Sequence, residues 1–207
     1  MRLLVVAATK LEVPMLHGGA RGSHQVDLIV TGVGMVATAA RVAQALARTP
    51  YDAAFNFGVC GSFNRALALG QVVHVTSDAL SELGVEDGDR FLTMRDLGLA
   101  PDASIENAAP AFGDLLRDLP QVRGITVNTV HGSDASIAAV TERLSPDVES
   151  MEGAAFAYAC TLFAVPYAQV RGVSNLVERR NRDAWRMDLA VRNLNAAAVH
   201  ILERACV

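Results

Sequence analysis

Two polar clusters enclose a largely apolar stretch of the chain, and both carry side chains suited to acid–base or hydrogen-bonding chemistry. The stretch begins with Glu149 and Glu152, where an extended run is expected to pass into a helix, and it ends with residues 171–175 (RGVSN). A carboxylate at a helix start is stabilised by the exposed N–H groups and the dipole there. Open α/β sheets bind ligands at the carboxyl ends of their strands. We therefore expect both clusters to face one crevice.

A third candidate is Glu12, which follows the apolar run of residues 3–8 (LLVVAA). Such a run is typical of a strand buried on both faces, so Glu12 is predicted to lie just past the carboxyl end of a strand. Val13 and Leu16 come next at helical spacing. Glu12 is therefore either a ligand contact or an ordinary carboxylate in the first turn of a helix, where it favours the dipole.

Residues 32–34 (GVG) lie between an expected strand at 26–31 and an Ala-rich helix at 36–47. Glycines at such a turn let the backbone approach a ligand, and the N–H groups can bind an anion. The dinucleotide-binding fingerprint is incomplete because position 37 is Ala. Tight packing of the helix on the strand explains the glycines equally well.

The elements that must position these residues alternate between strands and helices. Further strands are expected at 51–57, 71–76, 122–130, 147–150 and 167–173, and further helices at 104–119, just after residue 134, at 153–163 and at 184–204. Residues 77–103 are more polar and are interpreted as a surface excursion, either a lid or a subunit contact. The alternation predicts one three-layer α/β domain spanning residues 1–207.

Composition favours a small-molecule ligand. The chain has 207 residues, 51% of them hydrophobic, and 18 basic residues against 22 acidic ones, which argues against binding to a nucleic-acid backbone. Cys60, Cys160 and Cys206 are widely spaced and form no CxxC pair, so we expect neither a disulfide framework nor a zinc site, and a cytoplasmic location. No leader peptide or membrane-spanning run is expected.

Five short motifs, taken together and in order, resemble the purine nucleoside phosphorylase and methylthioadenosine nucleosidase superfamily. They are residues 7–13 (AATKLEV), 31–34 (TGVG), 56–58 (NFG), 151–152 (ME) and 170–175 (VRGVSN). The resemblance covers nearly the whole chain and implies a three-layer α/β/α domain with a central mixed sheet. It also implies cleavage of a nucleoside without a metal or cofactor, and a homodimer with the excursion near the subunit contact.

In the small nucleosidases of this superfamily, a Glu after the first strand activates water, a Met-Glu pair binds the ribose, and an Asp protonates the purine. Carried across, the first two roles fall on Glu12 and on Met151 with Glu152. The third falls on Asn175, which departs from the Ile-Ser-Asp of the adenine-releasing enzymes. An amide cannot deliver a proton, but it offers a donor and an acceptor that match the O6 and N7–H of a 6-oxopurine. The resemblance and this departure together predict hypoxanthine as the leaving base.

The runs 148–153 and 175–182 also resemble the hypoxanthine-releasing hydrolases of the superfamily, whose substrate carries a benzoate on its 5′ side. Arg179, Arg180 or Arg182, with Trp185 as a flat neighbour, would bind that carboxylate bidentately. The alternative is that these arginines form a solvated helix start.

Family geometry implies further contacts at Gly58 and the backbone up to residue 61, at Val130 and Gly132, at Ser174, and at Val33 near the 5′ group. His131 lies among them, although a lone loop histidine is more often merely solvated. Glu149 competes with Glu152 for the ribose, or pairs structurally on its strand.

Three other functions stay open at this point. A methylthioadenosine-type nucleosidase would differ in the base released. A phosphorylase would need an anion site, for which Arg21 and Arg41 are poorly placed. A silent nucleoside-binding protein would not require Glu12.

Overall fold

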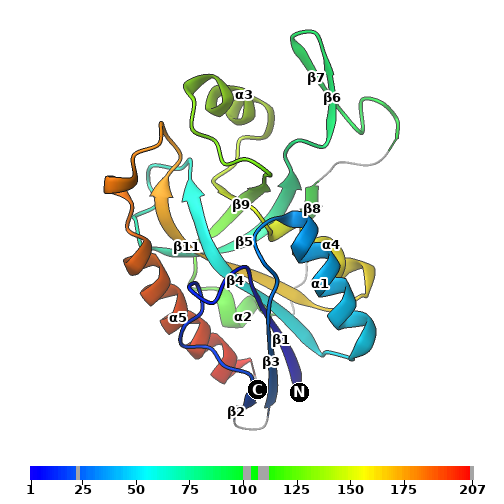
Figure 1. The fold of residues 1–207 in the computed structure, drawn as a ribbon, viewed down its shortest axis with the longest axis vertical. Helices are drawn as coiled ribbons and strands as arrows, with labels where there is room; N and C mark the ends of the chain where they lie inside the picture. Colours follow the sequence, from blue (N-terminus) through cyan, green and yellow to red (C-terminus); the bar gives the residue numbers. More distant parts are fainter. Residues whose placement is uncertain (22–23, 100–103, 107–111, 206–207) are drawn as a thin grey trace.

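The computed structural model describes residues 1–21, 24–99, 104–106 and 112–205, and most of its strands belong to one mixed sheet of nine (Figure 1). The main strand order is β10-β9-β5-β11-β4-β1-β3-β2, and β8 pairs with β5. The strands are β1 (Arg2–Ala7), β2 (Gly19–Arg21), β3 (His24–Val30), β4 (Ala53–Ser62), β5 (Val72–Leu80), β8 (Ser104–Glu106), β9 (Gln121–Thr126), β10 (Val148–Ser150) and β11 (Tyr167–Leu176).

The centre of the sheet is parallel, as the buried apolar runs predict. β3, β1, β4 and β11 pair in parallel, and so do β5 with β9 and β9 with β10. β5 and β11 are antiparallel. The short strand β10 also pairs antiparallel with β4, so that the sheet curls back on itself at one end.

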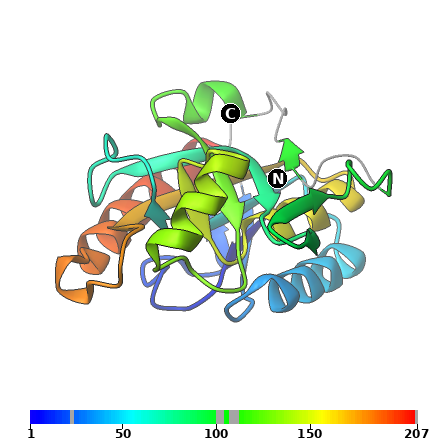
Figure 2. The ribbon, with the colours of Figure 1, turned by 90° about the horizontal axis from the view of Figure 1, so that it is seen from above.

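Helices cover both faces of the sheet, which gives the three layers predicted from the sequence (Figures 1 and 2). Helices α1 (Met35–Arg48) and α4 (Gly153–Leu162) pack on one face, where their core includes Leu4 and Val6. Helix α5 (Met187–Arg204) packs on the other face with the short α2 (Gly113–Leu116), and that core includes Leu3 and Val5. The alternation along β1 follows from the two-residue period of a strand. The expected α/β architecture with a central mixed sheet is confirmed.

The structure corrects several expected boundaries. Strand β5 continues to Leu80, so the surface excursion begins later than residue 77. It is a hairpin of β6 (Gly84–Asp87) and β7 (Arg90–Thr93) that projects from the body (Figure 1). The end of the expected excursion, residues 100–103, lies outside the described residues.

Two expected helices are wrong. The first is the helix predicted over 104–119. Residues 104–106 form β8 on the edge of β5, and among the described residues of this region the α-helix is limited to Gly113–Leu116. Residues 107–111 lie outside the described part. The segment around Glu12 is a series of turns rather than the start of a helix. Strand β9 ends at Thr126 rather than at residue 130. Helix α3 (Asp134–Leu144) begins where expected, with Ser133 as its N-cap.

The expected ends of β4 and β11 are also too early, and this matters for the site. β4 continues through the glycine-rich residues 58–61, and β11 continues past Ser174 and Asn175. The register places the carboxyl end of β1 beside Asn56 of β4, and β10 beside residues 61–62 of the same strand. Within the described residues no helix has the length and apolarity needed to cross a membrane.

Candidate active site

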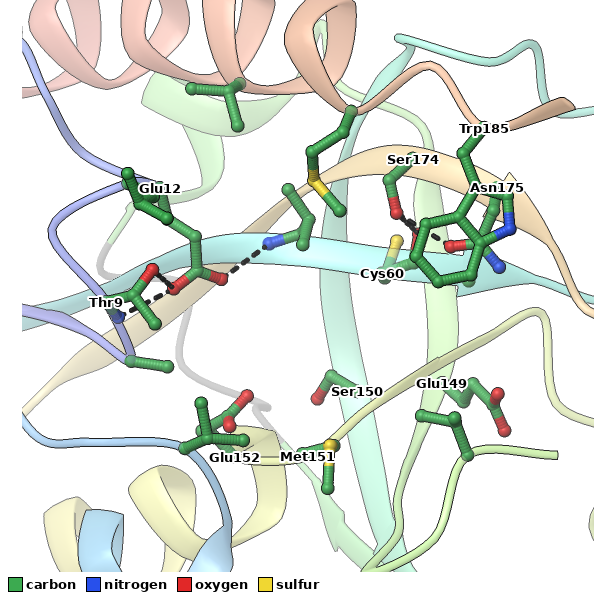
Figure 3. A pocket seen from close by; sticks show the side chains of 18 of the residues that line it. Thr9, Glu12, Cys60, Glu149, Ser150, Met151, Glu152, Ser174, Asn175 and Trp185 are labelled. Atoms are coloured by element: carbon green, nitrogen blue, oxygen red, sulfur yellow. Dashed lines mark hydrogen bonds between the residues drawn. The ribbon is translucent and has the colours of Figure 1, made fainter. Parts of the chain in front are cut away.

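A cavity of about 660 Å³ lies at the carboxyl ends of β1, β4, β10 and β11 (Figure 3). Its size is in the range of small-molecule sites. The described residues that line it are Ala8, Thr9, Leu11, Glu12, Val33, Val59, Cys60, Gly61, Val130, Glu149, Ser150, Met151, Glu152, Ser174, Asn175, Trp185, Met187, Asp188, Val191 and Arg192.

Most of the candidate residues from the sequence therefore meet in one place. Glu12 and Glu152 stand at one end of the cavity, which we call the Glu12 end (Figure 3). Asn175, with Ser174 and Trp185, stands at the opposite end, which we call the Asn175 end. Five predicted contacts do not line the cavity, namely Gly58, Gly132, Arg179, Arg180 and Arg182.

Glu12 is held by the backbone on both of its oxygens. One oxygen accepts hydrogen bonds from the backbone N–H and the hydroxyl of Thr9, at 2.8 and 3.1 Å. The other accepts from the N–H of Val59 on β4 at 3.2 Å. A β-carbon at Gly58 would lie 3.0 Å from this second oxygen, so the glycine leaves room for the carboxylate. Glu12 thus presents a fixed, half-buried carboxylate to the cavity.

Glu152 is the residue before helix α4, and its side chain turns to the glycine loop predicted from residues 32–34. One of its carboxylate oxygens accepts a hydrogen bond from the N–H of Gly34 at 2.8 Å. Burial raises the pKa of Glu152 above its ordinary value, although Arg171 and the Gly34 N–H oppose that shift. The loop therefore serves here to orient a carboxylate, and no dinucleotide motif is involved.

Glu149 lies on β10 and is paired with His131, so the expectation of a merely solvated histidine is wrong. The Nδ1 of His131 lies 2.6 Å from one carboxylate oxygen, and the backbone N–H of His131 donates to the other at 3.1 Å. The Glu149 side chain is 3% exposed. Burial raises its pKa, and the pairing with His131 opposes the rise.

Asn175 enters the cavity because β11 is irregular at that point. The register with β4 shifts between Val173 and Asn175, and such a bulge redirects a side chain. The hydroxyl of Ser174 lies 2.8 Å from the Asn175 side-chain oxygen, and the Asn175 amide donates to the carbonyl of Leu176 at 3.0 Å. One N–H and at least one oxygen lone pair of the amide stay available for a ligand.

Trp185 stands beside Ser174 and Asn175 (Figure 3). The N–H of the next residue, Arg186, donates to the carbonyl of Ser174 at 2.8 Å and ties this segment to the end of β11. The guanidinium of Arg180 lies over the indole ring, 5.3 Å from its centroid. The indole is thus at the Asn175 end of the cavity with an arginine against its face.

Two arginines were missed as site residues by sequence reasoning. Arg192 on α5 lines the cavity, and only the packing of α5 brings it there. Arg171 on β11 is 1% exposed and lies beneath the Glu12 end, where its guanidinium approaches Gly58 and donates to the side chain of Asn56. A charged residue inside an otherwise apolar strand was the available signal for Arg171.

A buried acid, Asp78 on β5, completes this layer beneath the cavity. It accepts a hydrogen bond from the Thr126 hydroxyl at 2.8 Å, and the lack of a side chain on Gly153 gives it room. Burial raises the pKa of Asp78 to about 6, against the opposing effects of Thr126 and Arg171. A search of the described residues finds no group of acidic, histidine and cysteine side chains able to hold a metal ion.

The fold and the site define a class of nucleoside-cleaving proteins. The model of the phosphorylase superfamily matches residues 8–204, and the chain belongs to that family. Among curated relatives, the futalosine hydrolase of Thermus thermophilus is 31% identical over 96% of this chain and 94% of that protein. The futalosine hydrolase of Acidothermus cellulolyticus is 35% identical over 89% of this chain and 78% of that protein.

More distant relatives share the fold. A 5′-methylthioadenosine/S-adenosylhomocysteine nucleosidase of Colwellia psychrerythraea is 25% identical over 87% of this chain and 79% of that protein. The solved futalosine hydrolase of Helicobacter pylori superposes with a TM-score of 0.83 at 14% identity, covering 98% of this chain and 97% of that one. The nucleosidase of S. pneumoniae gives a TM-score of 0.82 at 21% identity, covering 98% and 99%.

Proposed function

We propose that the chain hydrolyses the N-glycosidic bond of futalosine, releasing hypoxanthine and dehypoxanthine futalosine, as a step of menaquinone biosynthesis. The identity to futalosine hydrolases supports this assignment. The observation that carries it is the position of Asn175, which stands in the cavity opposite two carboxylates, where the adenine-releasing enzymes of the superfamily have an Asp.

The proposed chemistry begins at the ribose. The carboxylate of Glu152 accepts hydrogen bonds from the ribose hydroxyls, and these strengthen as the sugar becomes an oxocarbenium-like cation. Met151, which lines the cavity beside Glu152, packs against the sugar. Because these interactions grow with the charge on the ring, they lower the barrier rather than simply tighten binding.

Glu12 is proposed to hold and deprotonate the attacking water. Its carboxylate has two acceptor oxygens fixed by Thr9 and Val59, so the remaining lone pairs face the cavity in a set direction. Arg171 beneath this end supplies positive charge near the carboxylates without lining the cavity.

Asn175 is proposed to stabilise the leaving base. As the glycosidic bond breaks, negative charge spreads onto O6 and the imidazole ring of hypoxanthine, and the free amide N–H donates to it. Ser174 holds the amide in orientation. Val130 is proposed to lie beside the base and Val33 beside the 5′ group, and both line the cavity. Gly132, which does not line it, is assigned no contact with the base.

The benzoate of futalosine needs a cation. Of the described residues that line the cavity, Arg192 has the one basic side chain. Arg182 lines a smaller hollow that shares Trp185, Asp188 and Arg192 with the cavity. We add Arg192 to Arg179 and Arg182 as partners of the carboxylate. Each of these three arginines is replaced by Ala in turn. The variant that loses the partner of the carboxylate should show a KM for futalosine raised by about tenfold and an unchanged KM for inosine, which has no benzoate.

We further propose that residues 1–207 act as one domain in a cytoplasmic homodimer, without a cofactor and without contact to nucleic acid or a membrane. The projecting β6–β7 hairpin supports a subunit contact away from the main sheet (Figure 1). Sedimentation analysis tests the oligomeric state.

The decisive experiment is a phosphate-free assay of the purified protein on futalosine and, in parallel, on methylthioadenosine, with chromatography of the released base. We expect hypoxanthine from futalosine alone. Adenine from methylthioadenosine would make the protein a general nucleosidase. Activity that appears only with added phosphate would make it a phosphorylase.

A further inference from the structure

The buried guanidinium of Arg171 lies among three carboxylates. A β-carbon built on Gly58 would collide with Nη1 of Arg171 and lie 3.0 Å from Oε1 of Glu12, so both groups border that glycine. The charges acting most on Glu152 are those of Arg171 and Glu12, and those acting most on Asp78 are Arg171 and Glu152. One cation is therefore shared between two carboxylates that line the cavity and a third, Asp78, that is buried beneath it.

The amide of Gln169 stands between Arg171 and Asp78. Gln169 precedes Arg171 by two residues on β11, so both side chains lie on the same face of the sheet. Its side-chain oxygen accepts a hydrogen bond from Nη2 of Arg171 at 3.3 Å. The same side chain is hydrogen-bonded to Asp78 and opposes the rise that burial causes in the pKa of this acid. Because an amide has a donor and an acceptor, its N–H faces the carboxylate while its oxygen faces the guanidinium.

The pair of Asp78 and Gln169 is packed tightly against the start of helix α4. A β-carbon on Gly153 would collide with Oδ2 of Asp78 and with Oε1 of Gln169, so both side chains border this glycine. The hydroxyl of Thr126 donates to Oδ1 of Asp78 at 2.8 Å and accepts from the N–H of Ala154 at 2.7 Å. Asp78 and Gln169 are both 2% exposed. The acid is thus fixed next to the amide, with little room to turn elsewhere.

An apolar side chain in place of the amide would leave the guanidinium and the carboxylate of Asp78 free to pair directly. A charge-assisted contact shielded from water is stronger than a hydrogen bond to a neutral amide. Arg171 would then be drawn toward Asp78 and away from the carboxylates of the cavity. With less positive charge beside it, a buried Glu152 would take up a proton more readily.

We propose that Gln169 is a positioning residue that separates Arg171 from Asp78 and so keeps the positive charge beside Glu12 and Glu152. Gln169 does not line the cavity, and it acts through Arg171 alone. The consequence for catalysis rests on the proposed function, because it is the ionised form of Glu152 that is to accept from the ribose. The sharing of the charge among the side chains does not depend on the substrate.

The test is Gln169→Met, which nearly keeps the size of the side chain but removes its donor and acceptor. The carboxyl carbons of Glu152 and Asp78 are followed by ¹³C NMR in a pH titration of the unliganded protein, with signals assigned through Glu152→Gln and Asp78→Asn. We expect the pKa of Glu152 to rise by about one pH unit and that of Asp78 to fall, because the guanidinium moves from one to the other. A merely structural role would admit water and lower both values, since burial raises both.

A second substitution should cancel the effect of the first. In the Asp78→Asn background no carboxylate competes for Arg171, so adding Gln169→Met should leave the pKa of Glu152 as it is in Asp78→Asn alone. Gln169→Leu is a further apolar variant with the same expected shifts as Gln169→Met. Gln44→Met makes the matched change at an exposed position of α1 and should move neither carboxyl.

Two results would overturn the proposal. One is a pKa of Glu152 that is unchanged or lower in Gln169→Met and Gln169→Leu. The other is a rise that persists when Asp78→Asn is added, because the competing carboxylate would then have no part in it.

Turnover of futalosine distinguishes this inference from the proposed function. If Gln169→Met shifts the two carboxyls as expected but the natural protein does not cleave futalosine, the proposed function fails and the role of Gln169 stands. If the natural protein cleaves futalosine and the titration of Glu152 does not move, the role of Gln169 fails alone. Where both hold, the acidic limb of the kcat/KM profile of Gln169→Met should move to higher pH by the same amount as the pKa of Glu152.

Discussion

At the Glu12 end of the cavity, the carboxylates of Glu12 and Glu152 accept hydrogen bonds from backbone N–H groups of Thr9, Val59 and Gly34. At the Asn175 end, side chains share this role with the backbone: His131 contacts Glu149 through its ring and its N–H, and Asn175 contacts the Ser174 hydroxyl and the Leu176 carbonyl. Backbone donors are present whatever the local sequence, whereas side-chain donors change with one substitution. The Glu12 end therefore depends less on the identity of its neighbours, whereas a single substitution at His131 or Ser174 would remove part of the support at the Asn175 end.

The largest expected effect is at the Glu12 end. Glu12→Gln keeps one acceptor oxygen, so it retains the hydrogen bonds of Thr9 or that of Val59 but not both, and it cannot deprotonate water. We therefore expect kcat to fall by roughly a thousandfold. Hypoxanthine should bind as before, because the base lies at the other end. Steady-state kinetics and calorimetry check the two parts, and retained turnover would remove Glu12 from the role of base.

The buried acid beneath the site should make stability depend on pH. Burial raises the pKa of Asp78 in the folded protein to about 6, above the ordinary 3.8 of an aspartate. The contribution of protonated Asp78 to the free energy of unfolding is therefore fully present below about pH 4 and is lost as pH rises through 6. The loss is on the order of 3 kcal/mol. In urea unfolding, the free energy of unfolding of Asp78→Asn should therefore increase relative to that of the natural protein as pH rises from 4 to 7. Parallel pH profiles of the two proteins would mean that Asp78 is ionised without cost.

A pair of glycines tests how tightly the Glu12 end is packed. A β-carbon at Gly58 would collide with Arg171 and crowd Glu12, so Gly58→Ala should lower the free energy of unfolding by about 1–3 kcal/mol and reduce kcat. Gly132→Ala is the matched control, because nothing lies within 4 Å of the added carbon. Similar effects of the two substitutions would contradict the described packing.

The smallest effect is expected from a change at the Asn175 end that keeps shape. Asn175→Asp removes the amide donor and restores an acid that can protonate adenine, so hypoxanthine release should slow by about tenfold while adenine nucleosides become substrates. Competition between futalosine and methylthioadenosine measures this directly. Unchanged selectivity would mean that the base lies elsewhere.

The strands were the predictable part of the fold. Runs such as residues 3–8 and 167–173 are largely apolar and contain β-branched residues, and that pattern predicts a buried β-strand. The helix expected over 104–119 is wrong because residues 104–106 complete the edge of β5, a pairing that depends on distant residues. Pro14, two residues after Glu12, was a usable signal against a helix there, since the residue before a proline avoids the helical region.

The candidate site was predictable where it follows from strand ends. Glu152 and Asn175 were placed in one crevice by the rule that parallel strands carry ligands at their carboxyl ends, and Glu12 was added by the family resemblance. All three do line one cavity. Their roles stay predictions. The approach of Arg192 and the pairing of His131 with Glu149 could not be predicted, because each depends on how a helix or loop packs against a distant strand.

The double pairing of β10 has a consequence for how this molecule assembles. This three-residue strand joins β9 on one side and residues 61–62 of β4 on the other, so it closes contacts between parts of the chain that are far apart in sequence. Such closure carries a large entropic cost and slows folding. Because Glu149 sits on β10 and Glu152 directly after it, the site exists only once that closure is complete, and recovery of ligand binding during refolding should coincide with the final step rather than with the formation of the helices.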